Sequence, residues 1–301
     1  MTYQFEDKVT TLKRNINLNN TKNMKNQKTW LITGASQGLG LLTVKYLLAK
    51  DQIVIATTRD RNQFEPSILE NNNLTVISLD ITKESEVEAA VNMIITKHGK
   101  IDVLINNAGY GFLGAVEEAS SSEIEKVFVV NVMGTFNLLR YVLPFMRQER
   151  SGHIINFSSA SGLVSSSGFG IYNASKYAVE GLTEALKLDV EGLGIKVTLI
   201  EPGAFRTNFL GSSLGIAKNE ISDYASTAGK YKNIFLGNNG KQPGNPEKAV
   251  EAIVKITEME QPPLRLLLGT DAYKRVQTKI HQLNEEFERF KEITFSTDFI
   301  N

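Results

Sequence analysis

Residues 29–40 read TWLITGASQGLG, and this stretch decides the fold of the chain. Its apolar start predicts a buried strand at 30–33, and residues 39–49 predict a helix directly after the glycines. Between the two, the backbone must turn tightly and let a ligand approach the helix N-terminus, a position that binds phosphate. The turn therefore favours a bound nucleotide, although an ordinary tight turn from strand to helix could use the same residues.

The rest of the chain repeats this alternation of short apolar runs and amphipathic stretches, which predicts an α/β fold with a doubly wound parallel sheet. Because the runs are almost continuously apolar, we expect strands covered on both faces. The predicted strands are 30–33, 53–57, 75–79, 103–106, 153–157, 196–200 and 264–268, and the predicted helices are 39–49, 84–97, 122–147, 172–191 and 246–258. Residues 29–301 are thus expected to form a single domain, with a sheet of about seven strands between two helical layers.

Three segments depart from this alternation. Residues 1–28 are rich in Asn and Lys and are expected to form a flexible tail, with Met24 a candidate for the natural start. Residues 203–244 are rich in Gly, Ser and Asn with scattered aromatics, and such a long insertion predicts a lid. The last predicted helix, 272–292, carries an apolar stripe of about two heptads, which we expect to pack on its own domain and not in a coiled coil.

The composition argues against several classes of function. The 33 Lys and Arg residues balance the 33 Asp and Glu residues, so the net charge gives no reason to expect nucleic acid or an anionic membrane as a partner. The chain has no cysteine and its three histidines lie far apart in sequence, so we expect no metal site. We find neither an apolar run of about 18 residues nor a secretory signal, and expect a cytoplasmic protein that does not bind membranes.

The end of the second predicted strand bears on the choice of cofactor. In dinucleotide-binding folds, an acidic residue about 20 positions after the glycines holds the ribose hydroxyls of NAD. Arg59 stands at that place here, and its guanidinium can pair with the 2′-phosphate of NADP. We therefore predict NADP, with NAD the alternative if Asp60 or a shifted strand end serves the ribose.

Ser159, Tyr172 and Lys176 form the strongest candidate for catalysis. Four residues along a helix rise about 6 Å and return to nearly the same face, so the phenol and the ammonium can address one substrate. A free phenol, with a pKa near 10, is a poor base at neutral pH, but a nearby fixed cation can lower that pKa by about 1 to 3 units. The pattern predicts proton exchange with an alcohol or a carbonyl.

With these motifs the chain resembles the short-chain dehydrogenase/reductases of the shorter, non-extended branch, over about residues 29–270. The matching motifs are T-G-x-x-x-G-x-G at 33–40, N-N-A-G at 106–109, the family's Asn at Asn131, its Ser at Ser159, Y-x-x-x-K at Tyr172 and Lys176, and P-G-x-x-x-T at 202–207. The resemblance implies a Rossmann-type sheet in the order 3-2-1-4-5-6-7, the NADP-preferring subgroup, and a homodimer or homotetramer.

The resemblance also assigns roles. Tyr172 would exchange the proton with the substrate oxygen, while Ser159 would orient and polarise the carbonyl. Lys176 would bind the nicotinamide ribose and lower the pKa of the tyrosine, and Asn131 would hold a water that links this lysine to solvent. Together with Tyr172 and Lys176, the predicted cofactor contacts are Gly34, Ser36, Gln37, Gly38, Leu39, Gly40, Arg59, Asp80, Ile81, Asn107, Ala108, Gly109, Pro202, Gly203 and Thr207. Gln37 stands where many NADP-using relatives carry a second basic residue, and Asp80 could instead cap the helix that follows it.

These residues predict an oxidoreductase that transfers a hydride between NADP(H) and a secondary alcohol or carbonyl. Apolar residues near 109–112, 163 and 205–235 favour a moderately hydrophobic small-molecule substrate. Phe205 and Phe209 either line the substrate site or pack the lid, and the adjacent Glu117 and Glu118 are expected to be solvated. The alternatives are a non-catalytic NADP-binding redox sensor, which would have no use for the four matching catalytic positions, and an epimerase or dehydratase, which would resemble a different glycine spacing.

Overall fold

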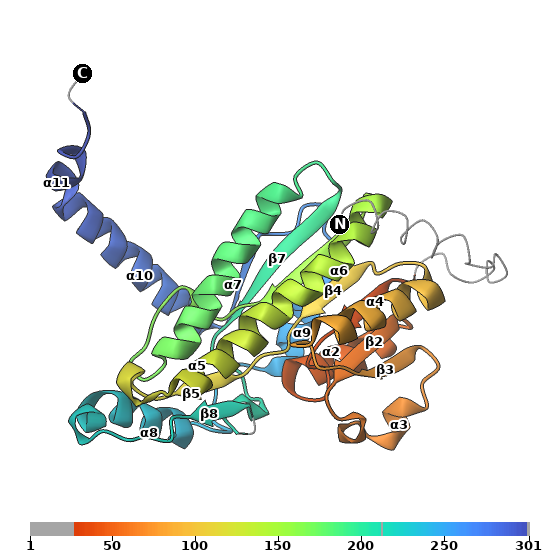
Figure 1. Ribbon diagram of the computed structural model, residues 1–301, viewed down its shortest axis with the longest axis horizontal. Coiled ribbons are helices and arrows are strands. Elements are labelled where there is room, and N and C mark those ends of the chain that lie inside the picture. The colour runs from red at the N-terminus through yellow and green to blue at the C-terminus, as the bar shows by residue number, and fades with distance from the viewer. Residues whose placement is uncertain (1–26, 212, 300–301) are drawn as a thin grey trace.

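The computed structural model describes residues 27–211 and 213–299, and within them the centre is a parallel sheet of seven strands (Figure 1). The strands are β1 (Thr29–Ile32), β2 (Ile53–Thr58), β3 (Leu74–Ser78), β4 (Val103–Asn106), β6 (Gly152–Phe157), β7 (Ile195–Pro202) and β9 (Arg265–Leu268). Their order, β3-β2-β1-β4-β6-β7-β9, confirms the expected Rossmann-type arrangement. The order reverses at β1, which pairs with β2 on one side and β4 on the other, so ligands are expected beyond the carboxyl ends of β1 and β4.

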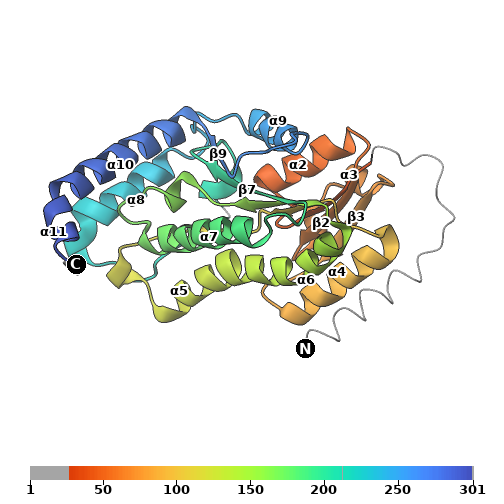
Figure 2. The same cartoon turned by 90° about the horizontal axis from the view of Figure 1, so that it is seen from above.

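Helices cover both faces of this sheet, as the continuously apolar strands predict (Figure 2). On one face lie α2 (Gly38–Leu48) and α9 (Pro246–Ile256), and on the other lie α4 (Glu84–His98), α6 (Gly134–Glu149) and α7 (Gly170–Asp189). Successive residues of β1 point to opposite faces of the sheet. Trp30 and Ile32 pack in the core beside α2 and α9, and Leu31 packs in the core beside α4, α6 and α7. The observed strands begin and end within two residues of the predicted ones.

The long helix predicted at 122–147 is present but is not uniform. It consists of α5 (Ser121–Phe128), a π-helical segment at Val129–Met133, and α6. By length and composition, the continuous stretch Ser121–Glu149 could cross a membrane, which departs from the expectation that no such segment exists. Its most apolar part is 56% buried inside the protein, as a helix that covers one face of a sheet requires.

The lid segment, residues 203–244, contains elements that the sequence did not predict. Its strand β8 (Leu214–Ile216) pairs in parallel with β5 (Gly111–Leu113), forming a two-stranded sheet separate from the main one. Farther along lies α8 (Lys230–Gly237), and Figure 1 shows β8 and α8 at the end of the domain near β5 and α5. The short helix α3 (Pro66–Leu69), after β2, was also not predicted.

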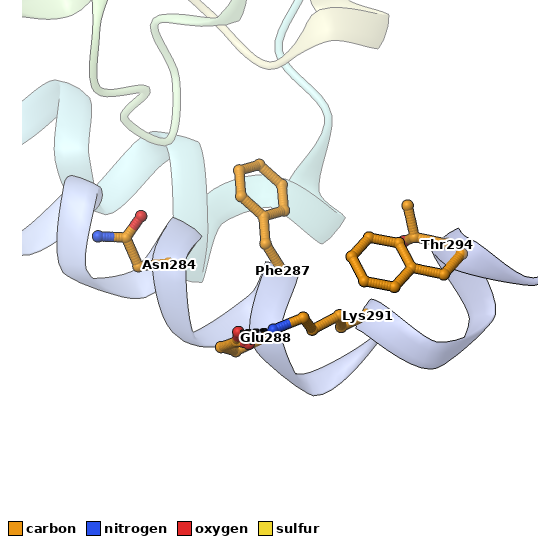
Figure 3. Close-up of a pocket in the computed structure, with 6 residues that line it drawn as sticks. Asn284, Phe287, Glu288, Lys291 and Thr294 are labelled. Atoms are coloured by element: carbon orange, nitrogen blue, oxygen red, sulfur yellow. Dashed lines mark hydrogen bonds and ion pairs between the residues drawn. The ribbon is translucent and has the colours of Figure 1, made fainter.

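The C-terminal helix contradicts the prediction that its apolar stripe packs on its own domain. The predicted helix is divided into α10 (Thr270–Arg289) and α11 (Lys291–Phe295), which extend away from the sheet (Figure 1). Of the stripe, Val276 is buried, whereas Phe287 is 66% exposed. Figure 3 shows Phe287 beside the Glu288–Lys291 ion pair (2.9 Å) on this outer part. The stripe continues beyond the last residue that the domain can cover, because the helix leaves the domain surface. The predicted tail and the Met24 hypothesis fall almost entirely on residues 1–26, which lie outside the described residues.

Candidate active site

In the glycine turn, residues 33–40, Gly34 and Gly40 have no space for a side chain. Gly34 and Gly38 have φ angles of +62° and +56°, a left-handed conformation that favours glycine. A side chain on Gly34 would lie 2.7 Å from the Cα atom of Ala108, and one on Gly40 would lie 2.6 Å from Asn107 Nδ2 and collide with the Gly34 carbonyl. The glycines are therefore required by close approach of the backbone to the end of β4 as well as by the turn itself.

Two polar side chains connect this turn to β4. The Thr33 hydroxyl accepts hydrogen bonds from the backbone N–H groups of Asn107 and Ala108, each at 3.1 Å. In return, Asn107 Nδ2 donates to the carbonyl oxygens of Thr33 (3.0 Å) and Gly34 (2.9 Å). Thr33 and Asn107, which lie 74 residues apart in the sequence, thus join the two motifs into one hydrogen-bonded unit at the switch point of the sheet.

The N-terminus of α2 follows this unit and suits an anionic group. Its N-cap, Gln37, provides no capping side-chain hydrogen bond, and the first turn contains no acidic residue. The early backbone N–H groups of α2 are therefore without an internal acceptor, and the positive end of the helix dipole points the same way. The residues present fit the diphosphate of a dinucleotide. Ser36 and Gln37 meanwhile bond to Gln63 and Ser213.

Arg59 and Asp80 lie at the carboxyl ends of β2 and β3. Arg59 is exposed, and its guanidinium forms no ion pair with any residue in the described ranges. The charge of Arg59 also acts on Asp80. Partial burial would raise the pKa of Asp80, but hydrogen bonds from Thr82 and the charges of Lys83 and Arg59 lower it below its usual value. Asp80 Oδ1 accepts from Thr82 N (3.0 Å) and Oγ1 (2.7 Å) in a local turn. It does not cap α4, as the alternative interpretation expected, because the N-cap of that helix is Lys83.

Ile81 is buried beneath α6. Its side chain occupies the space beside Gly134, and its carbonyl oxygen accepts a hydrogen bond from Asn137 Nδ2 at 2.9 Å. Packing accounts for the position of Ile81, and its contact with the cofactor stays a prediction.

Asn131 lies in the π-helical segment that interrupts the long helix. Both polar atoms of its side chain form hydrogen bonds. Oδ1 accepts from Tyr110 N (3.0 Å), and Nδ2 donates to Tyr110 O (3.0 Å) and Ser175 Oγ (3.1 Å). π-Helical turns often occur at functional sites, and here the turn points an amide at the chain that follows β4. The role of Asn131 in holding a water stays a prediction. In this structure the side chain fixes the backbone after Gly109.

Lys176 lies on α7, buried behind Tyr172. Its ammonium donates a hydrogen bond to the carbonyl oxygen of Phe157, the last residue of β6, at 2.8 Å. It lies 5.8 Å from the centre of the Tyr172 ring. Burial lowers the pKa of Lys176 to about 8, although the negative charge of Glu180 opposes this effect.

Tyr172 is covered by aromatic side chains, and only 5% of its surface is exposed. The rings of Phe169 and Phe209 lie 5.9 and 5.8 Å from it, and Phe235 in turn lies 4.5 Å from Phe169. Burial raises the pKa of Tyr172 to about 12, and the Ser159 hydroxyl offsets only part of this rise. Burial therefore dominates the pKa of Tyr172 in this structure, and its expected lowering by Lys176 stays a prediction.

Ser159 and the loop after β7 complete the arrangement. The Ser159 hydroxyl lies 3.4 Å from the carbonyl oxygen of Pro202 and accepts from Ser161 N at 3.1 Å. Thr207 packs against Gly38 of the glycine turn. Gly203 lies against Asp271, whose carboxylate accepts from Ala204 N at 2.8 Å. The structure therefore brings the predicted catalytic residues and the 202–207 motif to the same edge of the sheet as the glycine turn.

Several residues of this region were missed or misjudged from the sequence. Phe209 covers Tyr172, whereas Phe205 packs into the core beside α9, so only the first can line a substrate site. Glu117 is exposed as expected, whereas Glu118 is half-buried. Both also hold the lid segment, which was missed: Tyr224 Oη donates to Glu117 at 2.7 Å and Ile221 N to Glu118 at 2.9 Å. No local pattern marks these contacts, because their partners lie about 100 residues away.

Comparison with known proteins supports the resemblance to the short-chain dehydrogenase/reductases. The model of a family described as short chain dehydrogenase matches residues 28–214. A 3-ketodihydrosphingosine reductase from Bacteroides thetaiotaomicron is 39% identical over 241 residues, which cover 79% of this chain and 87% of that protein. Human retinol dehydrogenase 8 is 34% identical over 254 residues, covering 79% and 80%. The crystal structure of a short-chain dehydrogenase from Streptomyces avermitilis superposes with a TM-score of 0.85 at 36% identity, covering 91% of this chain and all of that one.

Two more distant structures were solved with cofactors. ElxO with NADP bound has a TM-score of 0.67 at 25% identity, with 81% of this chain and 97% of that one covered. A Burkholderia phymatum protein in complex with NAD has a TM-score of 0.75 at 23% identity, covering 87% and 95%, and that likeness concerns the fold alone.

Proposed function

Since this chain belongs to the short-chain dehydrogenase family and is an NAD(P)-dependent oxidoreductase that acts on a small molecule, we propose that it interconverts a secondary alcohol and a carbonyl with NADP(H), using Tyr172 as acid and base. The nicotinamide, when bound, supplies or accepts the hydride. The observation that carries the proposal is the placement of Tyr172, Ser159 and Lys176 at the same edge of the sheet as the glycine turn.

Arg59 is the basis for preferring NADP. It is exposed at the end of β2, has no ion pair with the described residues, and extends positive potential over Asp80. A 2′-phosphate there would gain charge-assisted hydrogen bonds, which are stronger than the neutral bonds available to a ribose hydroxyl. NADP bound to ElxO is consistent with this preference.

The proton chemistry favours carbonyl reduction at neutral pH. Because burial raises the pKa of Tyr172 to about 12, its Oη atom carries a proton that it can donate to a carbonyl oxygen. The nearby Ser159 hydroxyl can donate to the same oxygen and stabilise the charge that develops on it. Lys176, whose pKa is about 8, remains cationic below that pH and can return a proton to the Tyr172 hydroxyl after it has donated its own.

The surroundings of Tyr172 favour an apolar substrate. Phe169, Phe209 and the partly buried Tyr110 form one cluster around it, with apolar side chains of β5 and β8. A charged substrate would lose its hydration there without compensating partners. The relatives named for 3-ketodihydrosphingosine and for retinol are consistent with a hydrophobic ketone or alcohol. Because Tyr172 is almost fully covered and Phe209 packs beside its ring, we expect Phe209 to move when substrate reaches the hydroxyl.

The test is the rate of NADPH-dependent reduction of a panel of apolar ketones by Tyr172→Phe. Removal of the proton donor should lower kcat by about 10²- to 10⁴-fold, with NADPH affinity little changed. Tyr273→Phe, an exposed tyrosine on α10, is the matched control and should keep the parental rate. Equal rates in both variants would remove Tyr172 from catalysis, and NADPH binding without turnover of any ketone or alcohol would favour a redox sensor.

A further inference from the structure

A pair of buried carboxyl groups lies behind Lys176. Glu180 follows it by one helical turn on α7 and Glu201 is the penultimate residue of β7, and they are 5% and 0% exposed. Arg265 of β9 reaches both, with Nε 3.2 Å from Glu180 and 3.5 Å from Glu201. Its Nη2 atom binds a third, more exposed carboxylate, Glu184, at 2.8 Å. These four residues come from three neighbouring elements and form one charge cluster.

If every carboxyl group of this cluster is ionised, some of the buried carboxylate oxygens have no hydrogen-bond donor. Both oxygens of Glu201 and one oxygen of Glu180 are buried without a hydrogen-bond partner among the described residues. Three carboxylates would also outnumber the two cations available, Arg265 and Lys176. Buried carboxylates that share one site cannot all carry charge, and a proton held between two of them supplies the missing donor and balances the charges.

The cluster contacts the catalytic residues through the ends of β6 and β7. The buried Ser158 hydroxyl and Glu180 Oε1 both lie against Gly162, so they are neighbours. Ser158 stands between Phe157, whose carbonyl receives the Lys176 ammonium, and the catalytic Ser159. On the other strand, Glu201 precedes Pro202, whose carbonyl oxygen meets the Ser159 hydroxyl.

We propose that Glu180 and Glu201 share one proton, and that the single negative charge left on the pair makes them positioning residues that keep Lys176 in place and protonated. The role in catalysis rests on the proposed function, whereas the shared proton does not. The groups that face the pair are Lys176 and Glu184 from α7, Arg265 from β9, and the uncharged Ser158 from the end of β6.

Electrostatics agree with this geometry. Burial, and next the charge of Glu180, raise the pKa of Glu201 to about 8. Burial likewise raises the pKa of Glu180, although Ser158 and Arg265 act against the rise. The pair therefore holds its proton at neutral pH and releases it in the pH range in which Lys176 loses its own.

The shared proton can be observed without any substrate. Infrared difference spectra of the unliganded protein between about pH 6 and pH 9 exclude ordinary carboxyl groups, which are ionised throughout that range. We expect a protonated carboxyl band that disappears on going to the higher pH, and that is absent from both Glu180→Gln and Glu201→Gln. Absence of the band from the parent protein would overturn the proposal, and this result does not require that either variant folds.

The positioning role is tested by pH profiles of kcat/KM. Glu180→Gln leaves the single negative charge on Glu201 of β7 and takes it away from Glu180, the carboxylate whose charge acts on Lys176, so the fall of activity at high pH should begin about one pH unit lower than in the parent. The exposed Glu191→Gln is the control and should leave the profile in place. Glu201→Gln, whose amide can donate as the protonated acid does, should retain about tenfold more activity at neutral pH than Glu201→Leu. Coincident profiles for Glu180→Gln and the control, or equal losses in the two Glu201 variants, would refute the role. Failure of the parent to reduce any ketone, with the band present, would affect only the proposed function.

Discussion

The glycine turn and the lid segment both lie at the carboxyl edge of the sheet, but they are held there in different ways. The turn packs backbone against backbone, with Gly34 in contact with Ala108, and its hydrogen bonds with Asn107 are partly buried. The lid segment is attached by the short pairing of β8 with β5 and by side chains at the surface, such as Tyr224 bonded to Glu117. A closely packed backbone has one arrangement, whereas surface hydrogen bonds contribute little and open easily. One side of the site is thus preformed, and we expect the surface-bonded part of the other side to move.

The largest expected effect comes from filling the glycine turn. In Gly40→Ala the new methyl group would meet the Gly34 carbonyl and Asn107 Nδ2, so the backbone must shift. We expect the free energy of unfolding to fall by about 1–3 kcal/mol and the affinity for both NADPH and NADH to be lost, as measured by chemical denaturation and fluorescence titration. Gly181→Ala on α7, where a methyl group meets nothing within 4 Å, is the control and should be stabilised by up to about 1 kcal/mol. Wild-type binding by Gly40→Ala would show that the turn is not preformed.

A smaller and more selective effect is expected at the edge of the turn. Arg59→Ala should weaken NADPH binding by about 10- to 100-fold, the value of charge-assisted hydrogen bonds to a 2′-phosphate, and should leave NADH binding unchanged. Calorimetric titration with both cofactors measures the ratio. The neighbouring exposed Arg61→Ala controls for a general loss of positive charge. An equal loss for NADPH and NADH in Arg59→Ala would contradict the preference for NADP.

The smallest effect is expected on the lid side. Phe209→Ala removes one ring that contacts Tyr172, so KM for an apolar ketone should rise by about 2- to 10-fold, while NADPH affinity and the unfolding free energy change little. Ile234→Ala, an exposed residue of α8, is the matched control. Should Phe209→Ala lower stability as much as Gly40→Ala does, the lid segment would be part of the rigid core and the contrast between the two regions would fail.

Much of the fold could be predicted from the sequence because its signals are local. Apolar runs defined the strands to within two residues, and the glycines and the four-residue spacing of Tyr172 and Lys176 describe geometry within single elements. The apolar stripe of α10 was misjudged, because periodicity reports that a face is apolar but not what covers it. The π-helical turn at Asn131 was missed as well, since its residues have ordinary helical patterning.

The sequence by itself determined the parallel sheet and the glycine turn before α2, and it predicted the candidate catalytic side chains, because these depend on residues close together in the chain. Only the tertiary structure decided that burial raises the pKa of Tyr172, that Glu117 and Glu118 hold the lid segment, and that Glu180, Glu201 and Arg265 converge behind Lys176. Burial and charge interactions arise from neighbours that the fold brings together from as far as 107 residues apart, and no local pattern records them.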